Sequence, residues 1–353
     1  MTLSLGTAAR SATDVVLDAV PGAVPAAVPA AASKRSAALT VDVRRALGGV
    51  LELVDEPGVR DILLQVTAGE GRLWVDRAGT LALIPNWRVP PEAVRQLACT
   101  LIAAGGRHLD ELHPCADVRL GDGIRVHAVL DPVAVEGAVV SIRIPAARVL
   151  SFEELLHAGL CSSARGARIR QLIIDRKNFL VSGGTGSGKT TLLTALLELV
   201  PGTERILTIE DVAELRPRHP HRIALEARQA NSEGAGEVTL DRLLREALRM
   251  RPDRIVLGEC RGAELATLLT ALNTGHDGGA GTLHANGIAE VGARLESLGL
   301  MAGLSAELLA SQVASAVHCV IHVERRNGVH RIAGLGRPRV GESGRLCVDE
   351  IPW

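Results

Sequence analysis

The chain has 353 residues, with 39 Lys and Arg against 40 Asp and Glu, and a formal net charge of -1. This balance argues against a protein built mainly to coat nucleic acid, which would carry a basic excess. Hydrophobic residues make up 47% of the chain, which excludes disorder over its whole length. With two Phe, three Trp and no Tyr, the chain also offers few rings on which single-stranded nucleic acid could stack.

The cysteines and the apolar runs indicate the cellular compartment. The six cysteines are scattered, and no pair has the C-x-x-C spacing of zinc or dithiol redox sites, which fits a reducing cytosol. No apolar run approaches the roughly 18–20 residues that span a bilayer. Asp14 and Asp18 lie near the N-terminal apolar stretch and argue against a secretory signal. We therefore expect a cytoplasmic protein without a membrane span.

The first 38 residues have low complexity, and Ala and Pro recur in them without an apolar period. Segments of this composition form flexible or extended linkers rather than packed domains. We therefore predict a disordered arm over residues 1–38.

Residues 39–145 combine strand and helix patterns in the way expected of a small α+β domain. Apolar residues recur near a 3.6-residue period over Pro91–Ala104, which predicts a helix that two glycines end. Residues 146–151 are the expected linker to a second domain. Strands are predicted at Asp61–Val66, Arg72–Asp76, Ile124–Leu130 and Val139–Ile144.

From residue 152 to 353, short apolar strands alternate with helices, which indicates a parallel sheet wrapped by helices. Thr239–Met250 is the clearest amphipathic helix, and Arg254–Gly258 is an apolar strand of the buried parallel kind. An Asn-Gly pair at 327–328 predicts a hairpin. Further strands are predicted at Asn178–Ser182, Arg205–Ile209, Arg222–Leu225 and Thr282–His284, and further helices at Lys189–Val200, Ala263–Leu272, 288–297 and 305–317.

A glycine-rich loop carries the most specific motif in the chain. Residues 183–190 read GGTGSGKT and match G-x-x-x-x-G-K-[ST] in full, with a strand before the loop and a helix after it. In such a loop successive backbone N–H groups point at one phosphate, and the helix N-terminus adds positive potential. Lys189 would bridge the β- and γ-phosphates of ATP, and the Thr190 hydroxyl would ligate Mg²⁺. The loop residues are Gly183, Gly184, Thr185, Gly186, Ser187, Gly188, Lys189 and Thr190.

Hydrolysis also needs a carboxylate that positions or activates water, and a group that holds Mg²⁺. Glu210 and Asp211 follow the apolar run ILTI, and Glu259 follows IVLG. Strand ends beside a phosphate loop are where ligand sites collect in α/β sheets. Gly258 stands where the generic second nucleotide motif has Asp, so Glu259 alone is expected to serve the metal-bound water.

Three further residues are weaker candidates. His284 ends a strand in the stretch HDGGAGTLHAN. A lone His is more often structural, but the surrounding glycines indicate a close backbone approach to a ligand. Arg125 and Arg143 lie on predicted strands of the first domain, and spacing alone does not distinguish them from ordinary surface arginines.

Four motifs, in this order and spacing, resemble the type II and type IV secretion ATPases. They read GGTGSGKTT, TIEDVAEL, ALRMRPDRIVLGECRGAE and ALNTGHDGGAGTLHAN. The resemblance extends over residues 39–335 and is nearest to the branch that serves tight-adherence (Flp) pili and conjugation-type secretion. It implies a protein of the α/β class, with a RecA-like P-loop NTPase domain at the C-terminal side and a smaller α+β domain before it.

The resemblance also implies an assembly and a setting. Members of this family form homo-hexameric rings that hydrolyse ATP with Mg²⁺ at subunit boundaries. The energy drives pilus assembly or secretion together with inner-membrane platform proteins. We therefore expect a peripheral position at the inner face of the cell membrane and no direct nucleic-acid partner.

Residue roles follow from the same resemblance. Residues 183–191 correspond to the Walker A loop, which adds Thr191 to the nucleotide-binding set. Glu259 corresponds to the Walker B glutamate, so the implied Mg²⁺ residues are Thr190 and Glu259. The implied catalytic residues are Glu259, Glu210 in the acidic box, His284 near the γ-phosphate, and Arg125 and Arg143, which lie in N-domain segments whose arginines reach the nucleotide.

Two alternatives stay open at this point. A nucleic-acid-dependent P-loop motor, such as a helicase, shares the RecA-like core, but the near-neutral charge and scarce aromatic residues count against it. A regulator that binds ATP and barely turns it over is disfavoured because Glu210, Glu259 and His284 are all present.

Overall fold

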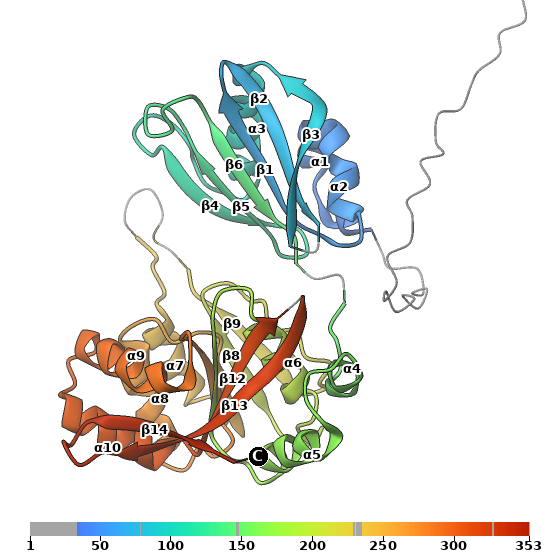
Figure 1. The fold of residues 1–353 in the computed structure, drawn as a ribbon. Coiled ribbons are helices and arrows are strands. Elements are labelled where there is room, and N and C mark those ends of the chain that lie inside the picture. The colour runs from blue at the N-terminus through green and yellow to red at the C-terminus, as the bar shows by residue number, and fades with distance from the viewer. Residues whose placement is uncertain are drawn as a thin grey trace, which may run out of the picture. The chain divides into compact units, whose positions relative to one another are not determined.

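The computed structural model describes residues 34–77, 79–145, 148–228, 230, 235–326 and 328–352. Most of the predicted disordered arm, residues 1–33, lies outside the described residues, as do residues 146 and 147 of the predicted linker. The described chain forms two β-sheets, one from residues before the linker and one from residues after it (Figure 1).

The first sheet has six strands in the order β3-β2-β1-β6-β5-β4, and all neighbours pair antiparallel. Its register places Arg125 directly opposite Arg143. The strands are β1 (Val59–Thr67), β2 (Glu70–Arg77), β3 (Thr80–Val89), β4 (Cys115–Leu120), β5 (Ile124–Val129) and β6 (Val139–Arg143). The helices are η1 (Arg35–Ala38), α1 (Val41–Leu47), η2 (Gly48–Val50), α2 (Leu51–Asp55) and α3 (Pro91–Ala104).

The first hydrophobic core forms between helix α3 and one face of the first sheet. Helix α3 has the predicted bounds, and its apolar stripe, including Val94 and Leu101, is buried. Alternate residues of β1, such as Ile62 and Leu64, belong to the same core cluster. A helix with a 3.6-residue apolar period therefore covers a sheet with a two-residue period.

Residues 35–38, which composition assigned to the arm, form the short helix η1. The backbone N–H of Ser36 donates to the carboxylate of Asp55 at 2.9 Å, and the Ser36 hydroxyl bonds to the same carboxylate. These bonds join η1 to the end of α2, and Ser36 is buried. The predicted arm therefore extends too far at its C-terminal end.

The second sheet has eight strands in the order β14-β13-β12-β7-β11-β10-β8-β9. The strands from β12 to β9 in this order are parallel, whereas β12, β13 and β14 pair antiparallel. The predicted parallel sheet and C-terminal hairpin are therefore both present. The strands are β7 (Phe179–Gly183), β8 (Ile206–Glu210), β9 (Arg222–Glu226), β10 (Arg254–Leu257), β11 (Ala280–His284), β12 (Cys319–Arg326), β13 (Val329–Val340) and β14 (Leu346–Ile351).

Helices cover both faces of this sheet. Ile255 and Leu257 of β10 belong to one core cluster and Val256 between them belongs to another. Helices α8, α9 and α10 pack in the first cluster, and α6 packs in the second. The helices are α4 (Phe152–His157), α5 (Ser163–Ile174), α6 (Lys189–Leu197), α7 (Leu240–Ala247), α8 (Glu264–Asn273), α9 (Ile288–Met301) and α10 (Ala306–Ala316).

Among the described residues, no single helix has the length and apolar composition needed to cross a membrane. Helices α9 and α10 meet these criteria only as a pair that is bent by 119°.

The carboxyl ends of four parallel strands bring the candidate residues to one edge of the sheet. The phosphate loop follows β7, and His284 is the last residue of β11. Glu259 follows β10 by two residues, and Glu210 ends β8. Because β7, β11, β10 and β8 are neighbours in this order, the loop and the acidic residues lie on adjacent strand ends.

Candidate functional site

The phosphate loop joins β7 to α6 with the geometry that its glycines allow. Gly186 and Gly188 have φ values of 71° and 97°, in the left-handed region that glycine adopts at little cost. Gly188 is the N-cap of α6, so Lys189 is the first residue of the helix. A Cβ built on Gly184 or Gly186 would meet no atom within 4 Å, so these glycines border open space. The loop therefore has room for a ligand at the N-terminus of a helix.

The Lys189 ammonium is buried inside this loop. Its Nζ donates to the carbonyl oxygens of Gly183 at 2.9 Å and Gly184 at 2.8 Å, and lies 3.3 Å from Nδ1 of His284. Burial lowers the pKa of Lys189, and the charge of Glu259 partly opposes this shift. The ammonium thus has neutral hydrogen-bond acceptors, and a phosphate anion would compensate the charge that burial destabilises.

His284 connects Lys189 to Glu259. Because an ammonium only donates, Nδ1 of His284 accepts, and the ring proton lies on Nε2. Nε2 lies 2.9 Å from Oε1 of Glu259, to which it donates. Burial, and then the charge of Lys189, lower the pKa of His284, and the charge of Glu259 partly opposes this shift. The structure therefore joins three of the sequence-predicted residues by direct contacts.

The second oxygen of Glu259 is held by a residue that the sequence analysis missed. Arg261 donates from one guanidinium nitrogen to Oε2 of Glu259 at 2.6 Å and from another to Oδ2 of Asp211 at 3.1 Å. Its side chain is 57% exposed. The sequence could have pointed to Arg261 through its position, because it lies two residues after Glu259 and therefore at the same strand end.

Glu210 is buried and organises the loop that follows β8. Its carboxylate accepts the backbone N–H groups of Glu214 and Leu215 at 3.0 Å. Burial raises the pKa of Glu210 to about 7, although these two hydrogen bonds oppose the shift. Glu210 contacts this loop and also lies against Gly258. A Cβ built on Gly258 would lie 2.5 Å from Cγ of Glu210.

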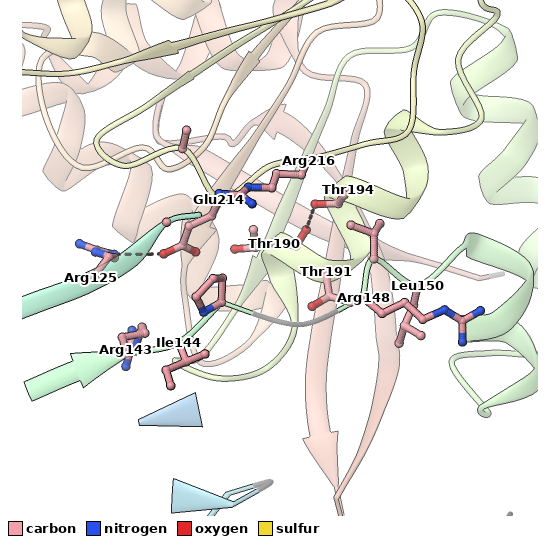
Figure 2. A pocket seen from close by; sticks show the side chains of 14 residues that line it. Arg125, Arg143, Ile144, Arg148, Leu150, Thr190, Thr191, Thr194, Glu214 and Arg216 are labelled. Atoms are coloured by element: carbon pink, nitrogen blue, oxygen red, sulfur yellow. Dashed lines mark hydrogen bonds and ion pairs between the residues drawn. The ribbon is translucent and has the colours of Figure 1, made fainter. Parts of the chain in front are cut away.

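The two predicted arginines have acidic partners. Arg125 pairs with Glu214 at 3.0 Å, and Arg143 pairs with Asp61 at 3.0 Å. Figure 2 shows the pairing of Arg125 with Glu214 beside Thr190 and Thr191. Both arginines line a cavity of about 250 Å³. The other residues that line it are Gly123, Ile144, Pro145, Arg148, Val149, Leu150, Thr190, Thr191, Thr194, Ala213, Glu214 and Arg216.

The donor set fits a nucleoside triphosphate with Mg²⁺. The buried hydroxyl of Ser187 has no hydrogen-bond partner in the described structure, and its Oγ lies 2.5 Å from the position of a Cβ built on Gly183, at the start of the loop. The described residues contain no group of three His, Cys, Asp or Glu that could enclose a metal ion. Mg²⁺ is usually held by one or two protein ligands together with phosphates and water. Thr190 and Glu259 would provide these ligands.

Comparison with known proteins agrees with this geometry. The fold and loop define a P-loop protein of the α/β class. Residues 50–332 match the family described as Type II/IV secretion system protein, and the chain belongs to this family of secretion ATPases.

Relatives and solved structures extend the match along most of the chain. A putative conjugal transfer protein of Mycobacterium tuberculosis is 48% identical over 306 residues, covering 84% of this chain and 86% of that protein. Conjugal transfer protein TrbB of Rhizobium radiobacter is 31% identical and covers 79% of this chain and 83% of its own. The pilus retraction motor PilT, solved with bound ADP, has a similar fold with a TM-score of 0.55 at 24% identity, covering 86% of this chain and 81% of PilT.

Proposed function

We propose that this protein hydrolyses ATP with Mg²⁺ and that the hydrolysis powers a conjugation-type secretion system or the assembly of a Flp-type pilus. The observation that carries the proposal is the contact series from Lys189 through His284 to Glu259, at the mouth of a complete phosphate loop. Membership of the secretion ATPase family supports the same activity.

Each residue has a defined task in this proposal. Bound ATP supplies the phosphoryl group, and Mg²⁺ neutralises charge on its oxygens. The loop N–H groups and Lys189 bind the phosphates, and the Thr190 hydroxyl ligates the metal. Glu259 orients a water molecule and accepts its proton at a carboxylate oxygen. His284 holds Oε1 of Glu259 through Nε2–H, so this carboxylate is oriented before the water arrives.

Glu210, Arg125 and Arg143 complete the proposed site. Glu210 fixes the loop after β8 through the N–H groups of residues 214 and 215. The arginines would stabilise charge on the transferring phosphoryl group, because a guanidinium pairs two phosphate oxygens and stays charged. An arginine that acts in this way is worth about 10³–10⁵ in rate in other NTPases.

The family supports a larger assembly for the active form. We propose a homo-hexameric ring with active sites at its subunit boundaries, recruited to the inner face of the cell membrane by platform proteins. Purified protein should therefore bind poorly to plain liposomes. An ATPase rate that rises when DNA is added would instead support a nucleic-acid motor.

Two substitutions test the hydrolysis. Lys189→Ala should abolish nucleotide binding or turnover, because it removes the cation in the loop. Glu259→Gln should retain ATP binding and lose turnover by about 10²-fold or more, because an amide does not accept the proton of the water. Phosphate release and binding of labelled ATP measure the two effects. Undiminished turnover in the Glu259→Gln protein would contradict the assignment of Glu259 as the proton acceptor.

A further inference from the structure

A histidine from the C-terminal hairpin lies against the phosphate loop. His330 is the second residue of β13, which pairs with β12. Its Nδ1 lies 2.7 Å from the backbone carbonyl oxygen of Ser187, 143 positions earlier in the chain. Because a carbonyl oxygen only accepts, Nδ1 carries the proton and donates it in this bond.

The ring of His330 also occupies the space beside Gly188. A Cβ built on Gly188 would lie 2.7 Å from Nδ1 and 3.1 Å from Cε1 of His330. The backbone of Gly188 has φ of 97°, which disfavours a side chain independently of the space available. Glycine is therefore required at position 188 for two reasons: the backbone turns there with a positive φ, and the His330 ring packs closely against it.

The bond to His330 fixes the orientation of one peptide of the loop. In a trans peptide the carbonyl and the N–H group point to opposite sides. The Ser187 carbonyl is turned toward β13, so the N–H of Gly188 is turned away from β13. In loops of this type successive backbone N–H groups cradle the phosphates, so the orientation of this peptide bears directly on how the loop binds its anion.

The hairpin also contacts the start of the loop. A Cβ built on Gly183 would lie 2.3 Å from the carbonyl oxygen of Val323, which belongs to β12. Main chain of β12 thus packs against the first glycine of the loop, and His330 of β13 packs against the last. The loop therefore packs against β12 and β13, in addition to its covalent connections to β7 and α6.

We propose that His330 is a positioning residue for nucleotide binding, which holds the Ser187 carbonyl so that the Gly188 N–H faces the phosphates. This inference rests on the proposed function, because it assumes that the loop binds ATP and ADP. The chemistry recognised is a polyphosphate anion, and His330 acts through the backbone without touching it.

The experiment compares three variants of the full chain. His330→Ala should weaken binding of ADP and of inorganic pyrophosphate about two- to tenfold, as expected for loss of one hydrogen bond that preorganises the loop. His330→Gln should recover most of the affinity, because its amide N–H can donate to the same carbonyl. His330→Phe retains an aromatic ring and lacks the donor, so it should bind as weakly as His330→Ala. Affinities come from calorimetric titration with each ligand.

A matched control is available in α4. Nδ1 of His157 lies 2.8 Å from the backbone carbonyl of Glu153, so His157→Ala removes the same kind of bond away from the loop. It should leave both affinities unchanged. A merely structural role for His330 would lower the melting temperature without ligand and would not distinguish the Gln variant from the Phe variant.

The outcomes separate the two claims. Equal ADP affinity in the wild-type, Phe and Gln proteins would overturn the role of His330 alone, even if the Ala variant fails to fold. Equal weakening in Phe and Gln would overturn it as well, because the donor would then be irrelevant. Wild-type protein that binds neither ADP nor pyrophosphate would overturn the proposed function together with this inference.

Discussion

At the scale of single residues, the position of the Glu210 side chain explains why residue 258 is a glycine. The sequence showed Gly where the generic Walker B pattern has Asp, and this departure had no explanation there. In the structure a Cβ on Gly258 would lie 2.5 Å from Cγ of Glu210. The side chain of Glu210, at its Cγ, thus occupies space that a side chain at 258 would need. The glycine is therefore required for packing beside the acidic residue on the neighbouring strand.

The buried carboxyl of Glu210 predicts a pH-dependent stability. Its pKa is about 7 in the folded protein and 4.5 as an ordinary glutamate, so the folded state binds more protons between these values. The free energy of unfolding therefore falls as pH rises from about 4.5 to about 7, and this effect is complete above that range. Glu210→Gln removes the charge. The stability of the variant relative to the wild type should therefore increase by about 1–3 kcal/mol between pH 5 and pH 8.

Urea denaturation of both proteins at the two pH values measures this difference. Other titrating groups are common to both proteins and cancel in the comparison. If the wild type and the variant differ by the same amount at pH 5 and pH 8, Glu210 does not titrate as described.

The sequence could predict some of the site residues and not others. Lys189, Glu259 and His284 follow or end apolar strands, and the ends of parallel strands lie at one edge of a sheet. Their direct contacts therefore follow from a pattern visible in the chain. The bond between His330 and Ser187 depends on the register of a hairpin against the loop, which no local pattern encodes.

Strand β3 and helix α4, which the sequence analysis did not predict, differ in the signal that their sequences carry. Strand β3 is the edge strand of its sheet and is mostly exposed, with Leu81 and Leu83 exposed at 50% and 37%, whereas Ile84, Trp87 and Val89 are partly buried against the first core. These partly buried positions are spaced by three and then two residues, so the strand offers no regular apolar alternation to detect. Helix α4 did carry a signal, because Ser151 and Glu154 form a capping box at its start. The last residue of the predicted linker, Ser151, could therefore have been predicted as the N-cap of a helix.

Arg261 joins the loops that follow two neighbouring strands, β8 and β10. It donates to Asp211 on one side and to Glu259 on the other. Arg261→Ala should lower turnover about tenfold or more while ADP affinity is maintained, because Glu259 loses one of the two groups that orient it. The free energy of unfolding should change by less than about 1 kcal/mol, because the side chain is largely exposed.

A control for this change lies on α7. Arg245 pairs with Asp241 at 2.9 Å with a side chain that is 64% exposed, so Arg245→Ala removes a similar surface pair away from the site. Steady-state phosphate release and ADP titration distinguish the two variants. Normal turnover in Arg261→Ala would show that Glu259 is oriented without it.

For the whole molecule, the candidate site draws residues from both sheets. Thr190 and Thr191 belong to α6 of the second domain, whereas Arg125 and Arg143 belong to β5 and β6 of the first sheet. All four line the same cavity (Figure 2). The side chains of Arg125 and Arg143 are 38% and 62% exposed, so both are also accessible to a second copy of the chain. Family resemblance, rather than composition, singled out these arginines.

Subunit mixing tests whether the arginines act across a boundary. Arg143→Ala and Lys189→Ala should each be inactive alone. If the arginine acts on the loop of a neighbouring subunit, a mixed ring contains boundaries where an intact Lys189 meets an intact Arg143. The mixture should then recover part of the wild-type phosphate release, and wild-type turnover per subunit should rise with protein concentration. A mixture that stays inactive while labelled subunits exchange normally would restrict Arg143 to its own chain, because exchange would have formed every possible boundary.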